Sequence, residues 1–380
     1  MSNPAIDSIT IQHYRIPLDP PFHASWDPNP RKSFTSTLVR VTAGGYEGVG
    51  SGDAMLGFEG HEHLFVGQDP FQIERHVKII DNLQFHYGRM WPLEAALWDL
   101  MGKISGLPVW KLMGGKRTMI KPYASTGTRI PPEQRAEAIV AIRDLGYEAV
   151  KLRFHAADPR SDLAIVRAVR DAVGPDLKIM VDANQGWQMP WDDSDPWDFK
   201  TALWMADALA ELDVFWLEEP LPRNDYRGMA ELRRLAKIRI GGGEGNRSYA
   251  EHAECLYHRS LDVYQADVVW STGLLRAKEL AQEAARQGAF FSPHTWGDGL
   301  VFLANLHVTC AVSNAPYLEF PFDPPWWTPE RRDFILPEPF YPNADGYLDP
   351  GEKPGFGIEI ERQALEPLRI KDGDGTIESV

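Results

Sequence analysis

Cysteine, basic charge and long apolar runs are all scarce in this sequence of 380 residues. Its two cysteines, Cys255 and Cys310, fall in predicted helices, so we expect buried thiols rather than a disulfide or a metal clip. No apolar run approaches the ~20 residues that a membrane helix needs. The stretch from Met1 to Leu18 lacks the basic-then-apolar pattern of a secretion signal. We therefore expect a cytoplasmic protein.

The charge balance excludes two further classes of partner. Lysine and arginine number 39 against 54 aspartate and glutamate residues, which gives a net charge of −15. An acidic surface repels phosphate backbones and anionic lipid headgroups, so we expect neither a nucleic acid nor a membrane as partner. The hydrophobic content of 43% and the charged content of 24% are ordinary for a globular protein, which argues against disordered and fibrous structure.

The first third of the chain has the pattern of a mixed α+β unit. The predicted strands cover residues 6–17, 33–41 and 46–53, and the predicted helices cover 71–85 and 92–104. The dipeptide Gly44-Gly45 separates the second strand from the third and predicts a hairpin turn. The second helix has Pro92 near its start and Gly106 beyond its end, as helices commonly do.

From residue 120 onward, short β-rich runs alternate with helical stretches. The eight runs cover residues 120–125, 149–154, 178–182, 214–218, 238–244, 262–267, 289–294 and 317–320. The seven helical stretches cover 132–144, 161–173, 199–212, 228–236, 249–258, 274–287 and 300–312. Alternation at this length predicts βα units around a parallel sheet, and eight strands indicate a (β/α)₈-type barrel that lacks its last helix. The Pro- and Gly-rich tail from Trp326 ends in a short extended piece, which we expect to return to the first unit.

Acidic side chains close three consecutive predicted strands, at Asp182, Glu218 and Glu244. The carboxyl ends of barrel strands meet at one mouth, where barrel active sites are built, so the three should converge. Carboxylates a few ångströms apart repel one another unless a cation intervenes or some are protonated. An oxygen-only set without cysteine or a nearby histidine favours Mg²⁺ over Zn²⁺. Any one of the three could instead cap a helix or pair with a base, but their succession favours a metal site.

The following strand ends supply a candidate acid–base pair, Asp267 and His294. A carboxylate beside an imidazole fixes its tautomer and stabilises its charged form. Such a pair acts as a general base and then, once it has taken a proton, as a general acid. Glu319 closes the last strand, either as a hydrogen-bond donor if it is protonated or as a salt-bridge partner. Lys151 and Arg153 close the second strand of the barrel pattern.

These motifs resemble the enolase superfamily, mandelate racemase subgroup. The ordered motifs are KLR (151–153), VDANQ (181–185), LEEP (217–220), GGGE (241–244), QAD (265–267) and SPH (292–294). The segments ALWDLMGK (96–103) and PVWKLMGG (108–115) are similar to those that close the first domain of this family. The resemblance covers nearly the whole chain.

The resemblance implies an α/β fold with a modified TIM barrel, (β/α)₇β, and an N-terminal α+β capping domain that the C-terminal tail completes. We assign residues 1–117 and about 335–380 to the capping domain and 118–334 to the barrel. The resemblance further implies Mg²⁺ on Asp182, Glu218 and Glu244, an Asp267–His294 dyad as catalyst, and a symmetric homo-oligomer. The shared chemistry is abstraction of the proton α to a carboxylate, with the metal holding the negative oxygens of the enediolate.

One departure from the racemase pattern selects between reactions. That pattern has Lys-x-Lys where this chain has Lys151-Leu152-Arg153, and its second lysine is the base on the opposite face. Arginine stays protonated and is a poor base. Racemisation needs a base on each face, whereas dehydration needs only His294, which takes the α-proton and then protonates the departing β-hydroxyl. Arg153 would bind carboxylate or stabilise the enediolate. Lys151 would hold the substrate carboxylate or a metal-bound oxygen, and it remains a candidate second base.

We therefore expect an acid-sugar dehydratase, a carbon–oxygen lyase that acts on an aldonate or aldarate and yields a 2-keto-3-deoxy acid. The partner would be a small-molecule carboxylate. A cycloisomerase, epimerase or racemase that acts on a related hydroxy acid or lactone through the same enediolate is the first alternative. A barrel that has lost catalysis and serves in binding is the second. The candidate substrate-binding residues, which include members of the capping loops 21–31 and 53–60, are His23, Trp26, Arg31, Met55, Asn184, His155, Trp296 and Asp298.

Overall fold

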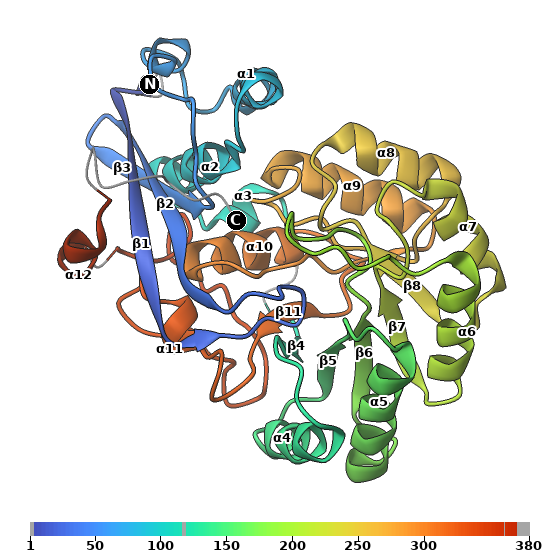
Figure 1. Cartoon of the computed structure of the whole chain (residues 1–380). Coiled ribbons are helices and arrows are strands. Elements are labelled where there is room, and N and C mark those ends of the chain that lie inside the picture. The colour runs from blue at the N-terminus through green and yellow to red at the C-terminus, as the bar shows by residue number, and fades with distance from the viewer. Residues whose placement is uncertain (1–3, 116–118, 361, 371–380) are drawn as a thin grey trace.

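The computed structural model describes residues 4–115, 119–360 and 362–370. Its first three strands form an antiparallel sheet in the order β1-β2-β3 (Figure 1). They are β1 (Ser8–Phe22), β2 (Arg31–Ala43) and β3 (Tyr46–Gly52). Gly44 and Gly45 form the turn between β2 and β3, with φ of 57° and 85°. Such values suit glycine in a two-residue hairpin turn, so the predicted hairpin is present.

The helices that accompany this sheet are α1 (Ile73–His86), α2 (Trp91–Ser105) and α3 (Val109–Leu112), with the 3₁₀ turn η1 (Glu62–Leu64). Helix α2 crosses β3 at very short range. A Cβ atom on Gly48 or Gly50 would lie 2.2 Å from a backbone oxygen of α2. The two glycines therefore allow the helix backbone to rest directly on the strand.

The first strand is longer than the sequence pattern predicted. It continues past Pro17 to Phe22, which pairs with Arg31 after a register shift. The capping loop that we expected over residues 21–31 is therefore limited to 23–30. Two prolines inside the segment, Pro20 and Pro21, hid this extension because proline is usually read as the end of a strand.

Eight parallel strands form the second sheet, in the order β10-β9-β8-β7-β6-β5-β4-β11. The strands are β4 (Pro122–Ser125), β5 (Ala149–Arg153), β6 (Lys178–Asp182), β7 (Val214–Glu218), β8 (Arg239–Gly242), β9 (Val263–Tyr264), β10 (Phe290–Phe291) and β11 (Leu318–Pro321). The helices between them are α4 (Pro132–Asp144), α5 (Pro159–Val173), α6 (Phe199–Ala210), α7 (Tyr226–Leu235), α8 (Tyr249–His258), α9 (Leu274–Arg286) and α10 (Gly299–Cys310). The sheet curls inside a ring of these helices (Figure 1), which confirms the predicted fold class.

Three of the predicted strands end early. Glu244, Asp267 and His294 were expected at strand ends, but they lie in the loops that follow β8, β9 and β10. At Gly243 the backbone has a φ of 103°, which stops β8 two residues before Glu244. Asp267 accepts hydrogen bonds from the backbone N–H groups of residues 269 and 270, so its side chain closes a turn.

Side chains that point into the curled sheet form successive layers along the strands. Tyr123, Ala149, Met180, Trp216 and Val263 form one buried cluster on neighbouring strands. Side chains alternate between the two faces of a strand, so positions two residues further on point to the same interior. Those positions are polar, and they are Ser125, Lys151, Asp182, Glu218 and Gln265. An apolar layer therefore supports a polar layer at the carboxyl ends of the strands.

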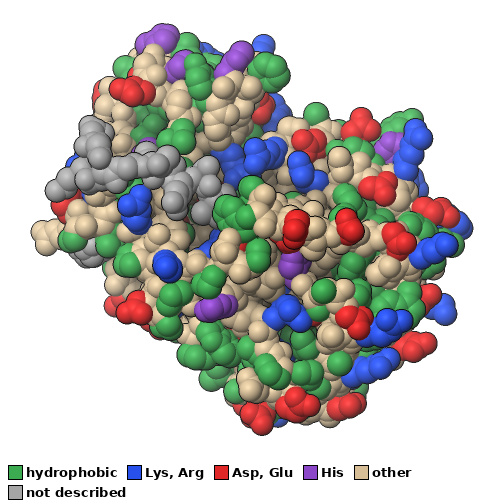
Figure 2. Space-filling view, in the orientation of Figure 1, with side chains coloured by type: hydrophobic (Ala, Val, Ile, Leu, Met, Phe, Trp, Pro, Cys, Tyr) green, Lys and Arg blue, Asp and Glu red, His purple; other side chains and the backbone are tan. Residues whose placement is uncertain are grey.

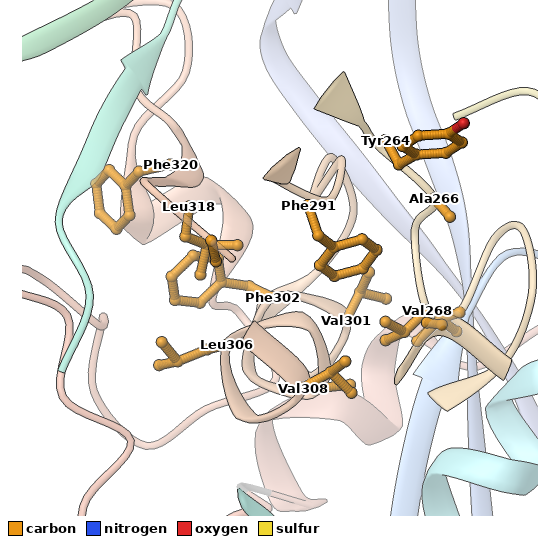
Figure 3. Close-up of a cluster of buried hydrophobic side chains, with 14 of the residues drawn as sticks. Tyr264, Ala266, Val268, Phe291, Val301, Phe302, Leu306, Val308, Leu318 and Phe320 are labelled. Carbon is orange, nitrogen blue, oxygen red and sulfur yellow. The ribbon is translucent and has the colours of Figure 1, made fainter. Parts of the chain in front are cut away.

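Helix α10 lies at the centre of the molecule, and all 12 of its residues are buried. Figure 3 shows Phe302 and Leu306 of this helix among Phe291, Leu318 and Phe320 of the barrel. Both cysteines are buried in helices, Cys255 in α8 and Cys310 in α10, and neither forms a disulfide, as predicted.

The tail contacts the N-terminal elements. Its short elements are α11 (Pro329–Arg332), α12 (Arg362–Leu365) and η2 (Glu366–Leu368). The N–H of Val109 donates to Gly355 O at 3.0 Å, and the N–H of Ile370 donates to His13 O at 2.8 Å. The domain boundaries stay a prediction, and the one between 117 and 118 lies outside the described residues.

Ion pairs add to the contact between the first unit and the barrel. Basic side chains gather between the lobe that carries α1 and the helices α8 and α9 (Figure 2). Arg276 of α9 lies 3.1 Å from Glu74 of α1. No helix within the described residues is long and apolar enough to cross a membrane.

Candidate active site

Three carboxylates meet at the barrel mouth. Each of Asp182, Glu218 and Glu244 offers an oxygen that lies within 4.8 Å of the other two, and all three side chains are buried. One oxygen of Glu244 accepts a hydrogen bond from Trp187 Nε1 at 3.0 Å, but its Oε2 is buried without a hydrogen-bond partner. The Oδ1 of Asn184 is likewise buried without one. An oxygen-only cluster with orphaned acceptors fits a hard divalent cation.

Two cations from β5 neutralise part of this charge. Lys151 Nζ lies 2.8 Å from Glu218 Oε1, 2.7 Å from Glu319 Oε1 and 3.8 Å from Asp182 Oδ2. Arg153 pairs with Asp182 and lies 3.3 Å from Glu319 Oε1. Burial lowers the pKa of Lys151, but the surrounding carboxylates outweigh it and raise that pKa above its ordinary value. Lys151 is therefore protonated in this arrangement, which disfavours it as a second base.

Glu319 is an acceptor in this network. Besides the two cations, it accepts hydrogen bonds from Ser125 Oγ at 2.7 Å and from the N–H of Thr295 at 2.8 Å. Burial raises the pKa of Glu319, but Lys151, His294 and Arg153 lower it further, to about 2. Of the two roles considered from the sequence, these contacts favour the salt-bridge partner, because an ionised carboxylate cannot donate.

The two candidate acid–base residues are in contact. His294 Nδ1 lies 3.0 Å from Asp267 Oδ2, and His294 Nε2 lies 3.8 Å from Glu244 Oε2. The contact with Asp267 favours a proton on Nδ1, which leaves Nε2 toward the carboxylates as the proton acceptor. Although burial lowers the pKa of His294, Glu244 and Asp267 raise it to about 9, so Nε2 accepts a proton only from the neutral form of the ring. A cation on Glu244 would offset the largest of these charges and favour that neutral form. Asn305 Nδ2 donates to the other oxygen of Asp267 at 3.2 Å and helps to fix its orientation.

Aromatic rings contact the guanidinium of Arg153. Its guanidinium carbon lies 4.8 Å from the ring centre of Trp26 and 5.5 Å from that of Trp296. Trp296 also stacks on Phe22 and donates to Ser125 Oγ at 3.2 Å. The side chain of Arg153 is only 3% exposed. Stacking and ion pairing together leave the guanidinium little freedom to move.

A cavity lies between the first sheet and the loops that follow β9 and β10. Its lining includes Thr35, Asp53, Trp270 and Trp296. The ring of Trp270 lies 5.5 Å from that of His294, so the cavity borders the acid–base pair. Arg89 covers the Trp270 ring at 4.3 Å and lies 3.0 Å from Asp53 Oδ2. Asp53 therefore presents a fixed carboxylate to the cavity.

Sequence reasoning did not single out Asp53, Arg89, Trp187 or Trp270. Asp53 had a weak signal, because it begins the 53–60 loop that we expected to set specificity. The other three had none, since nothing in their local sequence relates them to the barrel mouth. The structure brings Trp26, Asn184 and Trp296 to the site among the candidate substrate-binding residues.

The other candidates for substrate binding have different surroundings. Asp298 caps α10 and accepts a hydrogen bond from Ser36 Oγ at 2.6 Å, so it is held by structural contacts although it lines the cavity. Met55 is buried in the main hydrophobic core. His155 lies beyond the end of β5 and pairs with Asp192 at 2.7 Å, because strand alternation no longer applies there.

The remaining two candidates belong to the 23–30 loop and its end. Arg31 pairs with Asp27 at 3.0 Å, and Trp191 donates to the same carboxylate at 2.9 Å. His23 is exposed. These contacts of Arg31 do not involve the three carboxylates of the barrel mouth.

A family model described as enolase C-terminal domain-like matches residues 133–364. The chain belongs to this family. Arabinonate dehydratase from Saccharolobus solfataricus is 28% identical to it over 284 residues, which cover 73% of this chain and 71% of that protein. D-galactarolactone cycloisomerase from Agrobacterium fabrum is 28% identical over 323 residues, which cover 81% of this chain and 82% of that protein.

A solved structure of an L-talarate/galactarate dehydratase variant, liganded with Mg and L-glucarate, matches with a TM-score of 0.80 and 25% identity. The match covers 97% of this chain and 93% of that one. These findings confirm the resemblance read from the ordered motifs. This family member is similar to enzymes of sugar acids, among which dehydration and cycloisomerisation both occur.

Proposed function

We propose that this protein is a Mg²⁺-dependent sugar-acid dehydratase, acting on an aldonate or aldarate. It removes the proton α to the carboxylate, expels the β-hydroxyl as water and yields a 2-keto-3-deoxy acid. The observation that carries the proposal is the asymmetry of the site. His294 directs an imidazole Nε2, a group that can act as a base, at the carboxylate cluster, whereas the Lys151 ammonium is enclosed by carboxylates and the Arg153 guanidinium is permanently charged.

Asp182, Glu218 and Glu244 would hold the cation. Their oxygen donors, their mutual distance within 4.8 Å and the orphaned Oε2 of Glu244 support this assignment. The similar dehydratase structure that contains Mg supports it as well. When bound, the cation supplies positive charge that stabilises the negative charge which develops on the substrate carboxylate.

His294 performs both proton transfers in this proposal. Its Nε2 accepts the proton from C2, and Asp267 stabilises the resulting imidazolium through Nδ1–H. The same Nε2–H then protonates the hydroxyl on C3, the C3–O bond breaks, and a C2–C3 double bond forms as water leaves. The enol that results converts to the 2-keto-3-deoxy acid. Overall, the substrate loses one water and no redox partner is needed.

Arg153 supports dehydration over racemisation. A second proton transfer on the opposite face would need a neutral base there. Although burial lowers the pKa of Arg153, Asp182 and Glu319 raise it above its ordinary value, so the guanidinium stays charged. Its contacts with the rings of Trp26 and Trp296 suit a fixed cation that binds a substrate oxygen.

Cycloisomerisation is the second candidate function. The similarity to a D-galactarolactone cycloisomerase over 81% of this chain supports this candidate. Such a reaction could use the same base and cation, but it releases no water. The two candidates therefore differ in product rather than in the residues that the structure brings together.

The test is a screen of the purified protein with Mg²⁺ against a stereochemically complete panel of mono- and diacid sugars, with detection of 2-keto acid. Keto-acid formation that His294→Asn abolishes would support dehydration. A blank screen followed by α-proton exchange in D₂O would favour cycloisomerisation or epimerisation. Absence of both keto acid and exchange across the panel would refute the proposal.

The predictions of a homo-oligomer and of a cytoplasmic location belong to the same proposal. Light scattering of the purified protein and fractionation of its native cells would test them. A monomer in solution would contradict the first, and recovery outside the cytoplasm would contradict the second.

A further inference from the structure

Helix α9 begins without a side-chain cap of its own. The residue before it, Gly273, has a φ of 79° and provides no hydrogen-bonding side chain. Five other barrel helices, α5, α6, α7, α8 and α10, start with local caps, namely Asp158, Asp198, Asp225, Ser248 and Asp298. The first N–H groups of any helix need partners outside the helix, and Leu274 at this start is buried. Another part of the chain must therefore supply the cap of α9.

Glu94 of helix α2 supplies it from 180 residues away in sequence. Its Oε1 accepts the N–H of Leu275 at 2.8 Å, and its Oε2 accepts the N–H of Leu274 at 3.2 Å. Trp98 Nε1 donates to Oε1 at 3.0 Å and orients the carboxylate. A Cβ atom on Gly273 would lie 2.0 Å from Oε2, so this close approach requires glycine. The two carboxyl oxygens also face the positive end of the helix dipole.

The same helix makes a second contact with the segment before α9. Trp91 Nε1 donates to Ser271 O at 3.0 Å. Ser271 is further tied to the barrel, because its hydroxyl lies 3.0 Å from His252 Nε2 and donates to the backbone oxygen of Asn246. Helix α2 thus fixes both Ser271 and the start of α9.

The fixed segment is the one that carries Asp267. The backbone oxygen of Asp267 accepts the N–H of Ser271 at 2.9 Å and that of Thr272 at 3.3 Å. Its Oδ1 accepts the N–H groups of Val269 and Trp270 at 2.8 and 3.0 Å. Residues 267–275 therefore form one hydrogen-bonded unit, with Asp267 at one end and the Glu94 contact at the other.

We propose that Glu94 is a positioning residue, which couples the docking of α2 against α9 to the orientation of the Asp267–His294 pair. It contacts none of the reacting groups itself. Its effect passes through the 267–275 unit, which presents Asp267 Oδ2 to His294 Nδ1 and carries Trp270 against the His294 ring. The first unit would then help to orient the acid–base pair through helix α2.

Asp99 provides a matched control in the same helix. It is as fully buried as Glu94 and also accepts two backbone N–H groups, those of Val49 at 2.9 Å and Phe356 at 2.7 Å. Lys103 Nζ donates to it at 2.7 Å. Its contacts fix α2 to β3 and to the tail, and none of them involves residues 267–275. Loss of Asp99 therefore disturbs the packing of α2 without touching the proposed coupling.

Hydrogen–deuterium exchange of the full-length variants tests the coupling without a substrate. Glu94→Gln keeps the size of the side chain but retains one acceptor oxygen for two backbone donors. We expect amide exchange in peptides that cover 267–275 to accelerate at least 10-fold, with unchanged exchange in β3. Asp99→Asn should accelerate exchange near Val49 and Phe356 and leave 267–275 unchanged. Equal exchange of 267–275 in wild type and Glu94→Gln would overturn the proposal.

The catalytic measurement rests on the proposed function and uses the acid that the panel identifies. Glu94→Gln should lower kcat at least 10-fold while KM and the Kd for Mg²⁺ stay within about threefold. Asp99→Asn should leave kcat within about threefold at a similar loss of Tm. Equal losses of kcat in the two variants would mean that Glu94 only stabilises the fold, and they would refute the coupling.

A milder variant covers the case in which Glu94→Gln does not fold. Trp91→Phe removes only the indole N–H that reaches Ser271 and keeps the aromatic ring. We expect faster exchange in 267–275 and a smaller loss of kcat in the same direction, and no change in either would contradict the proposal. If no acid is turned over, the proposed function fails, but the exchange experiment still decides the coupling.

Discussion

Removal of the Lys151 ammonium should make the fold depend on a divalent cation. At an effective dielectric constant of 20, two ionised carboxylates no more than 4.8 Å apart repel by at least about 3.5 kcal/mol. Three such pairs among Asp182, Glu218 and Glu244 would sum to roughly 10 kcal/mol if all three were ionised. Lys151 offsets this repulsion through contacts of 2.8 Å with Glu218 and 2.7 Å with Glu319.

Lys151→Met keeps most of the volume of the side chain and deletes its charge. Removing one partner of a buried ion pair typically costs about 3–5 kcal/mol. A cation that binds only the folded state recovers stability, by about 2.7 kcal/mol at a concentration 100 times its Kd. We therefore expect the variant to lose Tm strongly without Mg²⁺ and to gain more Tm on addition of Mg²⁺ than the wild type does.

Differential scanning calorimetry with EDTA and with saturating Mg²⁺ measures both quantities. Lys121→Met is the matched control, because Lys121 pairs with Glu148 at 2.6 Å on the surface, where such pairs contribute about 0–1 kcal/mol. It should change Tm little and leave the Mg²⁺ response unaltered. If Mg²⁺ fails to raise the Tm of Lys151→Met, the assignment of the carboxylate cluster to a cation is wrong.

Three other predictions concern the base, the cavity and pH. His294→Asn should lower turnover about 10²–10⁴-fold, as expected for loss of a general base, while calorimetric Mg²⁺ binding persists; near-normal turnover would return Lys151 to consideration. Asp53→Asn should raise KM at least 10-fold with a smaller change in kcat, because Asp53 lines the cavity and not the carboxylate cluster; an unchanged KM would exclude it from substrate binding. Burial raises the pKa of Glu94 from 4.5 to about 7. Its protonated form therefore favours folding below pH 4.5, and this contribution, up to about 3 kcal/mol, is lost as pH rises through 7. Glu94→Gln should flatten the pH dependence of the unfolding free energy in this window, and an unaltered slope in chemical denaturation would contradict the assignment.

The parts of the site that lie on barrel strands could be predicted from the sequence. Asp182 and Glu218 follow directly from the rule that parallel strands direct their carboxyl ends to one mouth. Glu244, Asp267 and His294 lie two or three residues beyond the actual strand ends, yet the order and spacing of their motifs still located them. Each strand end contributes one short segment, and its position in the barrel depends on the count of βα units rather than on fine geometry.

The contributions of the first unit could not be predicted in the same way. Asp53 and Arg89 reach the cavity only because α2 and the first sheet dock at a particular place on the barrel. The contact of Glu94 with the start of α9 joins residues 180 positions apart, and no local pattern marks either partner. His155 illustrates the opposite error, since the alternation that worked for Lys151 and Arg153 was extended past the end of β5.

The arginine in the KLR motif depends on the tryptophans around it. The rings of Trp26 and Trp296 pack edge to face, with centres 5.1 Å apart, and form a corner whose ring centres lie 4.8 and 5.5 Å from the guanidinium carbon. Trp26 comes from the loop between β1 and β2, and Trp296 follows His294 by two residues. The segments that carry these two rings therefore also hold a permanent cation in the barrel mouth. Replacing Arg153 alone by lysine would not restore a second base, because the ion pairs with Asp182 and Glu319 that keep this position charged would remain available to the lysine. Proton transfer on a single face of the substrate would therefore depend on the residues around position 153 as well as on the arginine itself.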